Sequence, residues 1–173
     1  MRIAINGYFW GQETTGSGQY VRQLLSAMNE LAPQNEYLLF RPKRPESTDT
    51  TEVLPARSLS TPFSGRQPDL DKFWFEQLSF PDAAQKAGAQ VAHGPYWGSP
   101  LRPALPCVVT LHDLIPMLLP AYRGSALVRA YTRLAAESAR RASLIVTDSL
   151  ASRDDIIRLL HIPEDRISVV YLA

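Results

Sequence analysis

Short apolar runs alternate along the chain with longer segments in which apolar residues recur at helical spacing. The runs are rich in β-branched residues and hold few polar positions, which is typical of strands buried on both faces of a parallel sheet. The pattern predicts strands at residues 2–6, 36–40, 89–92, 107–111, 143–147 and 167–172.

The segments between these strands predict helices. After the first strand, Val21, Leu24, Leu25, Met28 and Leu31 recur as one apolar stripe of a helix that ends at Pro33. Further helices are predicted at 69–80, 82–87, 125–141 and 149–160.

Individual residues mark the ends and faces of these helices. Asp69 is predicted to cap the helix that begins there, and either Ser149 or Ser152 is predicted to begin the last helix. The helix at 69–80 should present a broad aromatic face that includes Phe73, Gln77 and Phe80. The residues expected to face inward in the helix at 125–141 are Leu127, Val128, Tyr131, Leu134 and Ala135.

The segment 41–68 breaks the alternation, because it is rich in proline, serine and threonine and has little periodicity. We interpret it as a long, partly mobile excursion with one candidate short strand at 53–54. A loop of this length inside a compact domain is uncommon and is usually functional or disordered.

The alternation of strands and helices favours an α/β fold. We predict a Rossmann-like, doubly wound, mostly parallel sheet with helices on both faces. The length of 173 residues suits one domain. Because the chain stops at Ala173 directly after a strand, we expect it to be a truncated piece or one half of a larger protein.

Composition excludes few classes of protein. The net charge of +1 gives no electrostatic case for binding nucleic acid. Cys107 is the only cysteine, so no internal disulfide can form, and its place in an apolar strand suggests an inert core residue. With neither a signal peptide nor an apolar run long enough to span a membrane, we expect a soluble, cytoplasmic chain.

Chemistry is expected where the strands end. In an open α/β sheet, ligands bind in the crevice outside the carboxyl ends of the strands, and three loops should meet there: 7–18, 93–97 and 112–113. His112 and Asp113 form a titratable pair directly after the central strand. Position alone leaves open whether Asp113 only caps the turn while His112 packs beneath it. In the middle loop, Tyr96 and Trp97 offer flat apolar surface of the kind that sugar rings pack on.

Thr15, Gly16, Ser17 and Gly18 lie between the first strand and its helix. Glycines allow close approach of the backbone, and free N–H groups at a helix start favour an anion. The segment matches neither the dinucleotide-binding glycine fingerprint nor a phosphate-binding Walker loop. The alternative is a flexible strand–helix turn.

Metal and nucleophile chemistry have weak support. Asp69-Leu70-Asp71 could hold a divalent ion, but it opens a helix, so capping explains it better. His93, His112 and Asp113 could form a facial metal site, although nothing in their spacing demands one. We therefore predict no metal.

Four segments in order resemble the N-terminal half of family 4 (group 1) glycosyltransferases, and they look closest to bacterial mannosyltransferase-like members. The match covers nearly the whole chain outside 41–68. The segments are TGSGQYVRQLL, VAHGPYWGSPL, VVTLHDLIPMLLPAY and SLIVTDSLASRDDIIRLLHIPEDRISVVYLA.

The resemblance implies one half of a GT-B enzyme, in which two Rossmann-like domains face each other across a cleft. Residues 1–173 would form the N-terminal, acceptor-side domain, and the donor-binding domain would lie outside this chain. The reaction would be retaining and independent of metal and cofactor. A nucleotide-sugar, for which GDP-mannose or a UDP-sugar is the guess, would donate to a glycan or lipid-linked acceptor. The fragment alone would be inactive, and the resemblance leaves peripheral contact with the inner face of the membrane open.

The resemblance also implies roles for residues. His112 would be the catalytic residue, reaching the transferred sugar by hydrogen bonding. The loop from Thr15 to Gly18 would approach the donor diphosphate or the acceptor, although many members have two adjacent glycines where this chain has Thr15-Gly16. His93, Tyr96, Trp97 and Asp113 would lie on the acceptor side. The alternative is a non-enzymatic α/β module for ligand binding or regulation.

Overall fold

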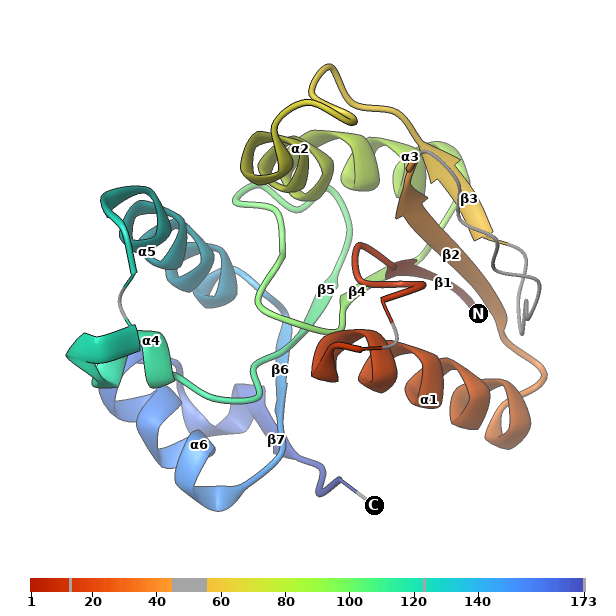
Figure 1. Cartoon of the computed structure of the whole chain (residues 1–173). Helices are drawn as coiled ribbons and strands as arrows, with labels where there is room; N and C mark the ends of the chain where they lie inside the picture. Colours follow the sequence, from red (N-terminus) through yellow and green to blue (C-terminus); the bar gives the residue numbers. More distant parts are fainter. Residues whose placement is uncertain (13, 45–55, 123, 173) are drawn as a thin grey trace.

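The structure is built on one sheet, in which every strand pairing is parallel (Figure 1). The computed structural model describes residues 1–12, 14–44, 56–122 and 124–172. Within these residues seven strands pair in the order β3-β2-β1-β4-β5-β6-β7, which confirms the predicted fold class. The strands are β1 (Arg2–Asn6), β2 (Glu36–Pro42), β3 (Ala56–Leu59), β4 (Val91–Gly94), β5 (Cys107–Thr110), β6 (Leu144–Thr147) and β7 (Ile167–Val169).

The order of the strands reverses between β1 and β4. The chain moves outward from β1 through β2 to β3, then returns to the other side of β1 and continues from β4 to β7. The register pairs Ile5 with His93 across this junction. Ligands of doubly wound folds bind at such a switch point, outside the carboxyl ends of the strands. The loops after β1 and β4 therefore flank the expected crevice.

Helices cover both faces of the sheet (Figure 1). The side chains of β1 and β2 alternate between the two faces and so belong to two separate hydrophobic clusters. Ile3, Ile5 and Leu39 form one cluster with α1 (Gly16–Leu31). Ala4, Leu38 and Phe40 join the larger cluster on the opposite face. The helical segments that contribute to that cluster are the π-helical continuation (Phe75–Ser79) of α2 (Pro68–Trp74), α3 (Phe80–Lys86), α5 (Ala126–Arg140) and the π-helical end (Ile156–Leu160) of α6 (Leu150–Asp155).

The apolar stripe of α1 is shorter than predicted. Val21 and Leu25 are buried, but Leu31 is 82% exposed. At 3.6 residues per turn, Leu31 lies about 80° around the helix from Val21, so it has drifted off the face that meets the sheet. The prediction that Leu31 packs inward was wrong.

The aromatic helix is one continuous helix with a π-helical segment in its middle. Its buried side chains include Phe75, Glu76 and Phe80, whereas Phe73 and Leu78 are exposed. The wide π turn carries an extra residue and rotates the rest of the helix, which a constant 3.6-residue period cannot anticipate. Asp69 is also not the N-cap, since Gln67 holds that position and Pro68 opens the helix.

The segment 41–68 contains a strand that the sequence did not predict. β3 pairs with β2 as a parallel edge strand, and the Lys43 amide donates to the Leu59 carbonyl at 2.8 Å. Its centre, Arg57-Ser58, is exposed, so β3 lacks the apolar run that marks a central strand. The candidate strand at 53–54 lies outside the described residues.

Further boundaries differ by a few residues. β4 begins two residues later than predicted and includes His93, and β7 ends at Val169 rather than at residue 172. In α5, Ser125 caps the helix, but Leu127 and Val128 are 55% and 43% exposed. Small residues of its C-terminal half, such as Ala135 and Ala139, make the buried contact instead. The prediction that Leu127 and Val128 face inward was wrong, because the N-terminal half of α5 does not pack against the sheet.

The last helix starts at the first of its two candidate caps. Ser149 caps α6, and its hydroxyl accepts the Ser152 amide at 3.1 Å. No helix in the described ranges has both the length and the apolar character needed to cross a bilayer.

Leu25 and Leu31 provide a matched test of the α1 packing. We expect Leu25→Ala to lower the free energy of unfolding by about 2–5 kcal/mol, because it opens a cavity in the core. Leu31→Ala should change it by less than about 0.5 kcal/mol, since the side chain is already in solvent. Urea unfolding of both variants measures this, and similar losses for the two would contradict the assigned face.

Candidate functional site

His112 is held at the carboxyl edge of the sheet by residues from two neighbouring strand ends. It lies two residues after β5, and Asp148 directly follows β6. The His112 Nδ1 atom is 2.6 Å from the Asp148 carboxylate, and its Nε2 atom is 3.3 Å from the Pro95 carbonyl oxygen. Since a carboxylate can only accept, the hydrogen bond requires a proton on Nδ1. Asp148 thereby sets the tautomer and the orientation of the ring.

Two further contacts restrain His112. The Tyr20 ring meets the imidazole edge to face, with the ring centres 4.5 Å apart. The Ser152 hydroxyl donates to the His112 carbonyl at 2.9 Å, which ties the loop to the start of α6. Sequence reasoning missed Asp148 and Tyr20 as site residues. The position of Asp148 directly after a buried strand was the signal that could have found it.

Asp113 has a local structural contact. Its carboxylate accepts the Ile115 amide at 2.9 Å, so it caps the turn that leads into α4 (Ile115–Leu118). Its carbonyl accepts the Trp97 indole N–H at 3.1 Å. That bond joins the loop after β5 to the loop after β4.

The glycine-rich segment forms the compact start of α1. The Thr15 hydroxyl accepts the Gly18 amide at 3.1 Å and donates to the Gln12 carbonyl at 2.9 Å. A Cβ atom on Gly18 would lie 2.1 Å from the Gln12 oxygen, whereas one on Gly16 would have no atom within 4 Å. Gly18 is therefore needed for the packing of the loop on itself. At Gly16 the space next to the backbone is open.

His93 lies inside β4 rather than in the loop where the sequence analysis placed it. Its side chain is 8% exposed, and Nε2 is 3.1 Å from the Thr110 hydroxyl. Burial lowers the pKa of His93 to about 4, so the ring is neutral at physiological pH. The Thr110 hydroxyl is in turn 3.5 Å from that of Tyr20. His93 thus supports the site from beneath instead of lining its surface.

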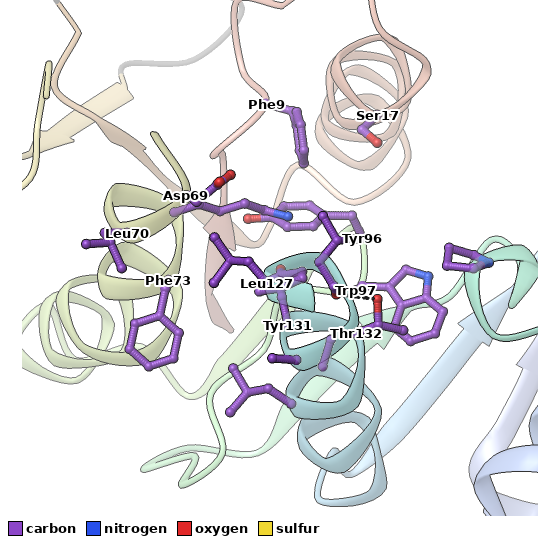
Figure 2. A pocket seen from close by; sticks show the side chains of 16 residues that line it. Phe9, Ser17, Asp69, Leu70, Phe73, Tyr96, Trp97, Leu127, Tyr131 and Thr132 are labelled. Atoms are coloured by element: carbon purple, nitrogen blue, oxygen red, sulfur yellow. Dashed lines mark hydrogen bonds between the residues drawn. The ribbon is translucent and has the colours of Figure 1, made fainter. Parts of the chain in front are cut away.

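Tyr96 and Trp97 face a cavity of about 660 Å³ that lies between α2 and α5 (Figure 2). Phe9 meets the Tyr96 ring edge to face at 4.8 Å, and the Tyr96 hydroxyl donates to the Asn6 side chain at 2.8 Å. Ser17 brings the start of α1 to the cavity. The other lining residues are Asp69, Leu70, Lys72, Phe73, Pro116, Leu127, Val128, Ala130, Tyr131, Thr132, Leu134 and Ala135.

A buried charged group lies next to this cavity. Glu76 is 1% exposed, accepts the Tyr131 hydroxyl at 2.7 Å and lies 3.7 Å from the Lys72 ammonium. The Lys72 ammonium in turn lies 4.3 Å from the centre of the Tyr131 ring and within about 6 Å of the rings of Tyr8, Phe9 and Tyr96. Burial raises the pKa of Glu76, an effect that exceeds the opposing effect of Lys72. Sequence reasoning missed this pair, because nothing in its spacing distinguishes it from a surface ion pair.

Metal-ligating residues do not gather in the described part of the chain. Across residues 1–12, 14–44, 56–122 and 124–172, no group of three or more histidine, cysteine, aspartate or glutamate side chains could hold an ion. Of the candidate Asp69-Leu70-Asp71 triplet, Asp71 accepts hydrogen bonds from the Thr61 and Ser64 hydroxyls. Asp71 thereby holds the loop at residues 61–64 against α2.

His112 and Asp148 lie at the carboxyl edge of a doubly wound, fully parallel sheet of the Rossmann-like class. Residues 15–173 match the family described as "Glycosyl transferase 4-like domain". The chain belongs to this family.

Individual relatives are more distant. The chain is 39% identical over 83 residues to O-antigen chain mannosyltransferase B of Escherichia coli, a match that covers 48% of this chain and 22% of that protein. Among solved structures, a sucrose-phosphate synthase from Thermosynechococcus elongatus superposes with a TM-score of 0.60 at 16% identity, covering 100% of this chain and 90% of that one. The wall teichoic acid polymerase TagF gives a TM-score of 0.50 at 10% identity, over 99% of this chain and 38% of its own. These structures show the fold alone.

His93 should make the stability of the chain depend on pH. Between its ordinary pKa of 6.5 and the folded value of about 4, the unfolded chain binds a proton that the folded chain does not. Stability should therefore fall as the pH drops through this range, by up to about 3 kcal/mol. Urea unfolding at several pH values measures the slope. The pH dependence of stability should become weaker in His93→Asn. It should persist in His161→Asn, because His161 is exposed. An unchanged pH dependence in His93→Asn would mean that other groups cause it.

The two glycines at the start of α1 should respond differently to a methyl group. Gly18→Ala should displace the loop at residues 9–12 and cost about 1–3 kcal/mol, because the new Cβ meets backbone that cannot move aside cheaply. Gly16→Ala should leave stability within about 0.5 kcal/mol. Thermal unfolding of the pair tests this, and equal effects would mean that the loop is not packed as described.

Proposed function

We propose that the chain is the acceptor-binding half of a glycosyltransferase that moves a sugar from a nucleotide-sugar to a glycan or lipid-linked acceptor. The observation that carries this proposal is the position of His112. It is oriented by Asp148 at the carboxyl edge of the sheet, beside both the start of α1 and a ligand-sized cavity. Family membership supports the reaction class, and the name of the E. coli relative supports a mannosyl donor such as GDP-mannose, with a UDP-sugar as the other candidate.

Sugar transfer has an oxocarbenium-like transition state and a departing diphosphate. We propose that the His112 Nε2 atom accepts a hydrogen bond from a hydroxyl group of the transferred sugar, in place of its contact with the Pro95 carbonyl. The donor then lies in a fixed orientation relative to the acceptor. Asp148 keeps the proton on Nδ1, so the Nε2 lone pair can accept a hydrogen bond.

The start of α1 suits the departing diphosphate. Backbone N–H groups and the helix dipole favour an anion there, and Gly16 leaves room for a phosphate to approach the backbone. Preorganised donors of this kind stabilise developing charge without having to reorganise during the reaction. The proposed transfer is retaining and uses no metal. Its remaining donor contacts would come from a domain outside residues 1–173, so these residues alone would be inactive.

Histidine variants of the complete enzyme test the assignment. We expect His112→Asn to lower kcat by about 10²–10³-fold, as for other lost transition-state hydrogen bonds, while circular dichroism stays unchanged. Asp148→Asn should lower kcat by at least about tenfold with little change in KM, because it disturbs the orientation of the ring rather than ground-state binding. The measurement is transfer of radiolabelled sugar from each candidate nucleotide-sugar.

His161→Asn is the matched control. His161 is an exposed histidine that ends the last helix in a left-handed conformation, which asparagine tolerates well. It should transfer sugar at the wild-type rate. Wild-type turnover in His112→Asn would remove His112 from the mechanism. The absence of transfer from every nucleotide-sugar would favour a non-enzymatic binding module.

A further inference from the structure

The cavity between α2 and α5 has walls that are mainly hydrocarbon. Leu70 and Phe73 of α2 lie on one side of it and Leu127 of α5 lies on the other (Figure 2), and Val128 of α5 also lines it. Leu127 and Val128 are 55% and 43% exposed, so the described residues leave much of these two apolar side chains uncovered. A concave site of about 660 Å³ falls in the size range of small-molecule sites, whereas a protein partner requires a broader surface.

The titratable side chains in and beside this cavity are of both types, acidic and basic. The Lys72 ammonium is next to Glu76, which is fully buried, and against the face of the Tyr131 ring. Asp69 supplies an acidic side chain to the same lining. An anionic ligand group would therefore meet a cation that is already paired. The arrangement suits an uncharged apolar group.

The cavity lies next to the candidate reaction site, because residues of its wall contact the His112 loop. Trp97 lines it and donates to the Asp113 carbonyl, next to His112. The Pro95 carbonyl, one residue before Tyr96 of the cavity wall, contacts the His112 ring. A molecule whose apolar part fills the cavity can extend a polar end along this loop towards His112.

We propose that the cavity binds the hydrocarbon chain of the acceptor, so that the acceptor is an amphiphile whose sugar or hydroxyl end lies towards His112. This inference rests on the proposed function, and it specifies the chemistry of the acceptor. A bare glycan would leave the aliphatic walls unfilled, since sugars are recognised through hydrogen bonds as well as ring stacking. The chain contributes binding energy remote from the reacting hydroxyl.

Alkyl glucosides of increasing chain length, used below their micelle concentrations, test this on the purified chain. Isothermal titration calorimetry and the change in tryptophan fluorescence, to which Trp97 of the cavity wall contributes, report binding. Affinity should rise by about fourfold per methylene from butyl to octyl glucoside, as expected for burial of each CH₂ group, and methyl glucoside should not bind measurably.

Two matched aspartate variants locate the site. Leu127→Asp should weaken octyl glucoside binding by at least about tenfold and abolish the dependence on chain length, because it places a charge in the apolar wall. Leu31→Asp introduces the same charge at an exposed leucine of α1 and should bind as the wild type does. Both positions are exposed, so both variants should fold, which circular dichroism verifies.

Three results would overturn the proposal: no binding, affinity independent of chain length, or equal binding by wild type and Leu127→Asp. A concentration-dependent dimer that Leu127→Asp dissociates would also overturn it, because a second copy would then cover the cavity. Binding needs no donor, so it is independent of transfer. Chain-length-dependent binding without any transfer would place the failure in the proposed function alone.

Discussion

Parallel alignment of the strands is the constraint on which the site depends. Every described strand has the same direction, so every strand delivers its carboxyl end to the same edge of the sheet. His112 and Asp148 are far apart in sequence, yet they meet because β5 and β6 are adjacent and in register. An antiparallel neighbour would have placed one of the two residues at the opposite edge. The chemistry of the site is thus a consequence of topology before it is one of individual contacts.

Asn6 connects the two halves of this edge at the switch point. It ends β1, and its side-chain oxygen accepts both the Tyr8 amide at 3.1 Å and the Tyr96 hydroxyl at 2.8 Å. The loops after β1 and β4 are therefore joined through one buried amide. Phe9 and Tyr96 then pack edge to face above it, so the wall of the cavity is built from both sides of the sheet reversal.

Much of this architecture was readable in the sequence, since continuous apolar runs mark buried parallel strands and helix periodicity marks their crossovers. The features that the sequence could not supply depended on local departures from regular geometry. With the π-helical turn at Phe75–Ser79, Phe75 and Glu76 are buried in the core and Phe73 is exposed, contrary to the regular helical pattern. Leu127 and Val128 follow the helical pattern of apolar residues, but the pattern does not distinguish a helix face that packs on the sheet from one that lines a cavity. Asp148 went unnoticed because the bond that defines it links residues on different strands.

The π-helical turn also bears on how this chain compares with its relatives. A π turn holds one residue more than an α turn, so Glu76 faces Tyr131 only while that additional residue is present. Loss of one residue between Phe75 and Ser79 would rotate one half of the helix by about 100° relative to the other. Glu76 would then turn relative to Tyr131, whereas Lys72 and Glu76, an i,i+4 pair, would move together if the lost residue followed Glu76. Family members that differ by a one-residue gap here should therefore differ in the chemistry of this cavity, whatever their overall identity.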